Sequence, residues 1–306
     1  MSDNRGWIGT LAVGLVAMVL VDPAAAAPGR QVQIDYQGAA LNGWLTEVES
    51  PRATVLMLHG TLAHANMEIM AGFAEVMAES GIESLRVTLS LGESDREGMY
   101  DCASTHRHTQ GSATGELEAW MDWLADHGRQ NIVVLGHSRG TNQVARYVVQ
   151  HAPGRAAGMV LVAPSVYRPQ LVSADYQETT GDPLQPLLEK ARALVAAGQG
   201  DTLMSDVHML YCPDAKASAE AFLSYYDADP DYDTLALALA GATPALVVVG
   251  TEDPLSAGVE DALAAGDPEN RISLLVVEGA DHFFRDLYAY DVVDGIIAWL
   301  DRVDPE

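Results

Sequence analysis

The sequence GHSRG at residues 136–140 restricts the fold of this chain more than any other segment. It follows an apolar run at residues 131–135 and precedes a helix-patterned stretch at residues 141–150. Glycines on both sides of Ser138 suit a strained strand-to-helix turn, because a side chain at either flanking position would collide with neighbouring backbone. The pattern G-x-S-x-G in this context predicts a nucleophile elbow that exposes Ser138.

A serine nucleophile needs a general base downstream of the elbow. Three histidines follow it in the chain. His151 is too close in sequence to fold back onto the serine, and His208 lies in a segment rich in Met and Tyr that is typical of a lid. His282 comes on a turn after a strand pattern at residues 272–277, where a mobile base is expected. We therefore predict His282 as the base.

The base in turn needs a carboxylate that fixes its tautomer. Residues 245–250 have the β-branched content of a buried strand, and the turn that follows contains Glu252 and Asp253. We predict Asp253 as the acid, with Glu252 as the near alternative. Asp281, beside the base, fits a capping or solvated loop carboxylate.

An oxyanion hole requires two backbone N–H groups, one after the nucleophile and one from an earlier strand–loop junction. Arg139 supplies the first. An apolar strand pattern at residues 55–58 ends in a His-Gly pair, so Thr61 is the expected second donor. His59 itself is interpreted as a packed loop histidine rather than a catalytic group.

Strand and helix patterns alternate along the rest of the chain, which predicts a mainly parallel, doubly wound α/β sheet with helices on both faces. Asn66 and Thr114 are the expected N-caps of two of the helices, and Gly81 the expected stop. The other strand patterns occupy residues 31–36, 41–48, 83–90 and 159–162, and the helix patterns occupy residues 66–80, 114–124, 259–265 and 292–300.

These motifs, in this order, resemble the α/β-hydrolase fold family from about residue 31 to the carboxyl end. The resemblance implies acyl transfer to water through a serine-bound intermediate, without a cofactor or a metal ion. Serine at the nucleophile position is unlike the haloalkane dehalogenases and epoxide hydrolases, which use aspartate there. The fold hosts many chemistries, so the resemblance does not supply the substrate.

Residues 165–242 break the strand–helix alternation and are too long for an ordinary connection. Helix-like stretches at residues 183–197 and 217–226 predict a helical cap insertion over the nucleophile. Its apolar and aromatic side chains are expected either to line an acyl pocket or to pack the cap against the sheet. The candidate pocket residues are Met209, Tyr211, Phe222, Tyr225 and Tyr226.

The amino end predicts a signal peptide at residues 1–26. Arg5 precedes an apolar stretch at residues 7–21, and three alanines ending at Ala26 offer a cleavage site. The alternative is an uncleaved anchor. Cleavage would leave a hydrolase domain at residues 27–306, periplasmic or secreted, with no stable membrane insertion.

Export favours a disulfide between Cys102 and Cys212, with reduced packing residues as the alternative. Such a bond would join the predicted cap to the body. His106 and His108 have a spacing that metal ligands use, but no second ligand cluster complements them. No metal site is therefore predicted.

The formal net charge of −26 comes from acids spread along the chain, which argues against a nucleic-acid partner. Together these features favour a serine hydrolase acting on small-molecule carboxylic esters. The first alternative is an amide or peptide hydrolase, aminopeptidase-like, with the same triad and an acidic or carboxylate-reading subsite in the cap. A non-catalytic binding protein on this fold is the second.

Overall fold

The structure is a computed structural model of the 306-residue chain, and it describes residues 29–267 and 271–303. The predicted signal peptide at residues 1–26 lies outside these ranges. Within them, no helix combines the length and the apolar character needed to cross a membrane.

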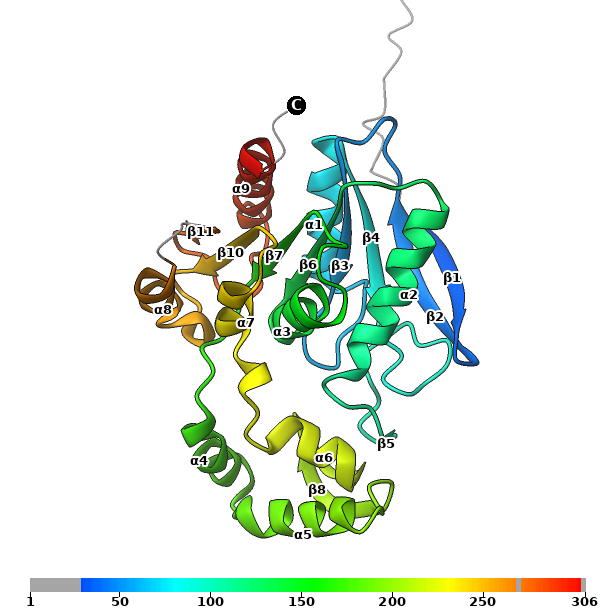
Figure 1. Cartoon of the computed structure of the whole chain (residues 1–306), viewed down its shortest axis with the longest axis vertical. Coiled ribbons are helices and arrows are strands. Elements are labelled where there is room, and N and C mark those ends of the chain that lie inside the picture. The colour runs from blue at the N-terminus through cyan, green and yellow to red at the C-terminus, as the bar shows by residue number, and fades with distance from the viewer. Residues whose placement is uncertain (1–28, 268–270, 304–306) are drawn as a thin grey trace, which may run out of the picture.

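An eight-stranded sheet forms the centre of the molecule (Figure 1), in the order β1-β2-β4-β3-β6-β7-β10-β11. β2 pairs antiparallel with both of its neighbours, β1 and β4, and all other neighbours in this sheet are parallel. This confirms the predicted mainly parallel sheet. The strands are β1 (Arg30–Tyr36), β2 (Ala39–Thr46), β3 (Ala53–Leu58), β4 (Ile82–Thr88), β6 (Ile132–His137), β7 (Gly158–Val162), β10 (Ala245–Gly250) and β11 (Ile272–Val277).

Helices cover both faces of the sheet, which explains why every residue of the central strands β3, β6, β7 and β10 is buried. On one face, α1 (Glu68–Glu79) and α9 (Tyr288–Val303) pack against residues such as Leu135. On the other, α2 (Ser112–Asp126), α3 (Arg139–Arg146), α7 (Thr234–Ala240) and α8 (Val259–Gly266) pack against residues such as Val134. A π-helical turn, Tyr147–His151, continues α3.

Two predicted helix caps are wrong. The N-cap of α1 is Met67, without a side-chain cap, because Asn66 lies in the preceding turn with its N–H bonded to His64 Nδ1. Thr114 lies inside the first turn of α2, where its hydroxyl donates to the Gly111 carbonyl. Gly81 follows α1 with φ +77°, the left-handed conformation expected of a residue after a helix.

Most of the segment between β7 and β10, as far as Tyr232, forms a cap at one end of the sheet, seen below the body in Figure 1. It is not purely helical, since its hairpin pairs with a short strand of the body into a three-stranded sheet, β5-β9-β8. The last cap helix begins at Ala219 rather than 217, because Ser218 Oγ accepts the N–H of Ala221 as an N-cap. The cap elements are α4 (Pro169–Thr180), α5 (Gln185–Ala196), β8 (Leu203–Met209), β9 (Cys212–Ser218), α6 (Ala219–Tyr226) and the 3₁₀ turn Pro230–Tyr232, and the body strand is β5 (Thr105–His106).

Cys102 and Cys212 form the expected disulfide, with a Cα–Cα distance of 5.2 Å. The bond joins the loop that follows β4 to the first residue of β9. It therefore fixes the cap hairpin to the body next to the β5–β9 pairing.

Candidate active site

Ser138 sits at the junction of β6 and α3 in a strained conformation, with φ +54° and ψ −123°. The tight turn requires both flanking glycines. A Cβ on Gly136 would lie 2.4 Å from the Gly140 carbonyl oxygen, and a Cβ on Gly140 would lie 2.6 Å from the His59 carbonyl oxygen. The geometry is that of a nucleophile elbow, which holds the serine side chain clear of the sheet.

Asp253 and His282 come from neighbouring strand ends and are hydrogen bonded, with Nδ1 and Oδ2 2.9 Å apart. The carboxylate also accepts the Ser256 hydroxyl at 2.8 Å and the Leu255 N–H at 2.9 Å. Burial opposes ionisation of Asp253, but these three hydrogen bonds outweigh it and lower its pKa below the ordinary value. Asp253 is therefore a stable anion that can orient the imidazole. It begins the 3₁₀ turn Pro254–Ser256 as its N-cap.

The two alternative carboxylates lie elsewhere. Glu252 is exposed, and its carboxylate makes no hydrogen bond or ion pair with His282 within the described residues. Asp281 Oδ1 accepts the N–H of Phe283 at 2.9 Å, so it caps its own loop. Of these three carboxylates, Asp253 is the one that the structure hydrogen bonds to the predicted base.

Close backbone packing positions the His282 loop. A Cβ on Gly250 would lie 2.3 Å from the Ala280 carbonyl oxygen, so the end of β10 touches the loop after β11. His137 Nε2 donates to the His282 carbonyl at 2.9 Å. Burial lowers the pKa of His137 to about 4, so the donor is a neutral imidazole near pH 7.

The backbone N–H groups of Thr61 and Arg139 border Ser138, and neither has an acceptor within the described part of the chain. A Cβ on Gly60 would lie 3.2 Å from Ser138 Cβ, so glycine allows the first loop to approach the serine closely. His59, by contrast, is fully engaged. Its Nδ1–H donates to the Gly60 carbonyl and its Nε2 accepts the Leu89 N–H, which fits a packed loop histidine.

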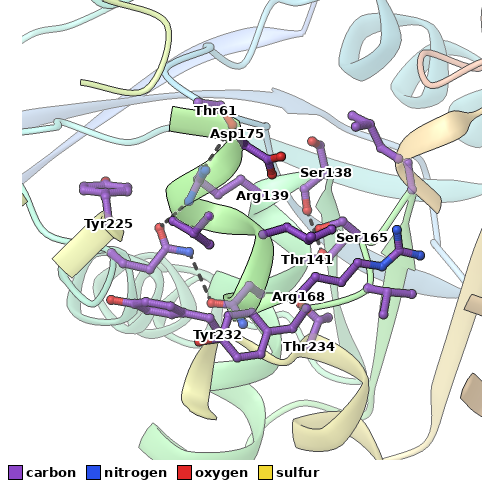
Figure 2. A pocket seen from close by; sticks show the side chains of 18 of the residues that line it. Thr61, Ser138, Arg139, Thr141, Ser165, Arg168, Asp175, Tyr225, Tyr232 and Thr234 are labelled. Atoms are coloured by element: carbon purple, nitrogen blue, oxygen red, sulfur yellow. Dashed lines mark hydrogen bonds between the residues drawn. The ribbon is translucent and has the colours of Figure 1, made fainter. Parts of the chain in front are cut away.

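Two cavities meet at Ser138 and His282. Both residues line each cavity. No hydrogen bond joins their side chains in this structure. The polar cavity, about 490 Å³ in volume, lies between the body and the cap (Figure 2). The apolar cavity, about 330 Å³, is lined largely by Met67, Ile69, Met70, Met99, Tyr211 and Phe283.

The five cap residues considered for the acyl pocket fall into three places. Tyr225 and Tyr226 line the polar cavity, and Tyr211 lines the apolar cavity. Met209 and Phe222 are fully buried in the hydrophobic core and line neither. Most of the apolar wall comes from the body instead.

Sequence reasoning missed this body wall. Met67 and Met70 follow the helical spacing of a core-facing stripe, which gives no sign of a cavity. Met99 lies in an irregular loop. For Phe283, the sequence offered one indication that the residue lies at the site, because it directly follows the predicted base.

Buried neutral histidines should make the protein less stable in acid. Burial lowers the pKa of His59 and His108 to about 3 and that of His137 to about 4. Between these values and about 6.5 the unfolded chain binds protons that the folded state does not, so stability falls as pH falls. We expect up to about 1.4 kcal/mol per pH unit from each histidine.

The measurement is urea denaturation between about pH 4.5 and 6, comparing wild type with His108→Gln. In the variant, the pH slope of the unfolding free energy should be smaller by the contribution of about one proton taken up on unfolding. An unchanged slope would show that His108 is protonated equally in both states.

A sheet of this order, with a strained serine after a central strand and a hydrogen-bonded Asp–His pair beyond it, is the arrangement of serine hydrolases with the α/β-hydrolase fold. Residues 49–284 match the sequence profile described as serine aminopeptidase, S33. The chain belongs to this family of the α/β-hydrolase superfamily. No curated protein sequence matches it.

Solved structures share the fold at low sequence identity. Est1E from Butyrivibrio proteoclasticus with ferulic acid bound has a TM-score of 0.64 and 15% identity, covering 90% of this chain and 100% of its own. The monoacylglycerol lipase of Paleococcus ferrophilus has a TM-score of 0.58 and 16% identity, covering 86% and 99%. A monoglyceride lipase from Saccharomyces cerevisiae in complex with a substrate analogue has a TM-score of 0.62 and 14% identity, covering 92% and 98%.

Proposed function

We propose that the protein hydrolyses small carboxylic esters through an acyl-enzyme on Ser138. The observation that carries the proposal is the Asp253–His282 hydrogen bond at the point where the elbow serine meets both cavities. The two lipases that share the fold support an ester substrate.

In the proposed mechanism, His282 takes the Ser138 proton as the serine oxygen attacks the ester carbonyl. Asp253 holds the imidazole in the tautomer that can accept this proton and stabilises the imidazolium. The N–H groups of Thr61 and Arg139 receive the developing oxyanion. His282 then protonates the leaving alkoxide, and the same groups activate water to release the acid.

The apolar cavity is the proposed acyl site, because its methionine and phenylalanine side chains offer no partner for polar groups. We expect kcat/KM in a 4-nitrophenyl ester series to rise at most about fourfold per added methylene, since each buried methylene contributes about 0.8 kcal/mol. The rate should then fall once the chain exceeds the cavity. A profile that still climbs at long chains would contradict a bounded acyl site.

An amide hydrolase with the same triad is the second candidate. The matching family profile carries the description of a serine aminopeptidase. An enzyme of that kind needs a charged subsite for the end of its substrate, and the polar cavity contains both Asp175 and Arg139.

Two assays separate the candidates. A fluorophosphonate probe should label wild type and not Ser138→Ala, which establishes the nucleophile. A panel of acyl esters and aminoacyl amides should then show turnover of the esters. Turnover confined to the amides would replace the first candidate with the second, and absence of labelling would favour a non-catalytic protein.

We also propose that the protein works in the periplasm or outside the cell. The disulfide supports this location, because disulfides persist in oxidising compartments. Mass spectrometry of the mature protein should find Ala27 at the amino terminus, and an intact Met1 would contradict cleavage.

A further inference from the structure

The Arg139 side chain occupies an unusual position for a cation in this acidic protein. It is half-buried in the wall of the polar cavity, one residue after the nucleophile. Figure 2 shows it extending from α3 toward Thr61 and Tyr225. Its Nε donates to Thr61 Oγ1 at 3.1 Å and its Nη1 to Gln110 Oε1 at 3.4 Å.

These two contacts hold the guanidinium in place but leave some of its N–H groups without an acceptor. Arginine has five N–H donors, and only two of them have acceptors within the described residues. Both acceptors are neutral, and no carboxylate lies within ion-pair distance of Arg139 in residues 29–267 and 271–303. Acidic residues outnumber basic ones 43 to 17 in the sequence, so a half-buried arginine without a carboxylate partner is conspicuous.

The groups that support Arg139 are themselves hydrogen bonded to buried or partly buried side chains. The guanidinium carbon lies 5.3 Å from the centre of the Tyr225 ring, and the Tyr225 hydroxyl is hydrogen bonded to the buried His108 at 2.8 Å. Gln110 is buried too, and its amide donates to Asn142 Oδ1 at 3.2 Å. The charge and its donors are therefore preorganised before any ligand arrives.

The carboxylates of the same cavity do not neutralise Arg139. Asp227 is held by Arg192 through two hydrogen bonds, at 3.0 and 2.6 Å. Asp175 lines the cavity as an exposed side chain. A second cation of the cavity, Arg168, is also exposed and donates to the Ala257 carbonyl at 3.0 Å.

We infer that Arg139 is the carboxylate-binding group of a substrate subsite in the polar cavity, and that the preferred ester carries a carboxylate on its leaving-group side. The inference rests on the proposed ester hydrolysis and names its substrate class. The guanidinium can offer two parallel N–H groups to a carboxylate, the geometry in which arginine binds such groups best. The acyl chain then lies in the apolar cavity, on the other side of Ser138.

The test compares two nearly isosteric esters, 4-carboxyphenyl butanoate and 4-carbamoylphenyl butanoate, which differ by the charge. The readout is the ratio of their kcat/KM values in wild type and in Arg139→Gln. We expect the variant to lower the ratio about 10- to 100-fold, the range of a charge-assisted hydrogen bond. The ratio in Arg139→Lys should lie between those of wild type and Arg139→Gln, because lysine keeps the charge but not the planar pair of donors.

Two other variants serve as matched controls. Arg168→Gln removes a cation from the same cavity without touching the preorganised site, and should change the ratio less than about threefold. Asp175→Asn removes a repelling carboxylate, and should raise the ratio. Binding of 4-hydroxybenzoate, measured by calorimetry, should weaken in Arg139→Gln, while binding of 4-hydroxybenzamide changes little.

The outcomes separate this inference from the proposed function. The subsite would be overturned if Arg139→Gln lowered kcat/KM equally for both esters. It would also be overturned if Arg139→Gln and Arg168→Gln lowered the ratio equally. In either case the proposed ester hydrolysis would stand. A charge preference seen only with 4-nitrophenyl hemisuccinate against 4-nitrophenyl butanoate would place the carboxylate on the acyl side and overturn the assignment. No turnover of any ester in wild type would refute the proposed function itself.

Discussion

Replacement of Ser138 or His282 by alanine is expected to lower kcat on the best ester by about 10⁴-fold or more. The loss is large because the serine oxygen forms the acyl-enzyme and the imidazole moves every proton of the proposed reaction. Each variant should fold, since Ser138 is only half-buried and the His282 side chain is 16% exposed. Steady-state kinetics and circular dichroism provide the two measurements.

The double variant should be no slower than either single variant, because the two residues act as one unit. Asp253→Asn should also lose activity, but less than either alanine variant, and Glu252→Gln should stay near wild type. Full activity in Ser138→Ala would end the proposed mechanism. A Glu252→Gln enzyme slower than Asp253→Asn would transfer the role of the acid to Glu252.

Loss of the Cys102–Cys212 disulfide should have the largest effect on stability. The bond closes a loop between residues 110 positions apart, and the chain-entropy model assigns about 4 to 5 kcal/mol to a loop of this length. Structure that persists in the unfolded cap would reduce this value. We expect Tm to fall by about 10 °C when the protein is reduced, measured by calorimetry with and without a thiol reductant.

The matched control is the double variant Cys102→Ser/Cys212→Ser, whose Tm should be low and insensitive to the reductant. The disulfide prediction would fail if two thiols of the non-reduced mature protein react with an alkylating reagent. Because the bond anchors the cap hairpin whose Tyr211 lines the apolar cavity, its loss should also raise KM for esters more than it lowers kcat.

Several features of this protein were predictable because their causes are local in the chain. The strained turn at Ser138 requires small residues at fixed positions, so the GHSRG segment after an apolar strand indicates it without any tertiary information. The carboxyl ends of parallel strands meet at one edge of a sheet, so a carboxylate after β10 and a histidine after β11 were expected to be neighbours. Their contact of 2.9 Å agrees with that expectation.

Helix starts and the cap were harder to predict. Asn66 and Thr114 have the right side chains for N-caps, but the turn at His64 and the first turn of α2 use those groups otherwise. The strands β8 and β9 carry polar residues on their exposed side, and the pairing of β9 with β5 joins segments about 110 residues apart. No local pattern reports a pairing at that distance.

The sequence by itself therefore determined the sheet, the strained turn at Ser138 and the strand ends that carry Asp253 and His282, since each depends on patterns within a few residues. Only the tertiary structure decided which side chains surround Ser138. Met99 of a body loop, Tyr211 of the cap and Phe283 of the base loop meet in one cavity. Arg139 lacks a carboxylate partner within the described residues because of how the cap and body pack around it. A cavity is the space that packed elements leave between them, and its shape and charge depend on contacts between residues distant in the chain.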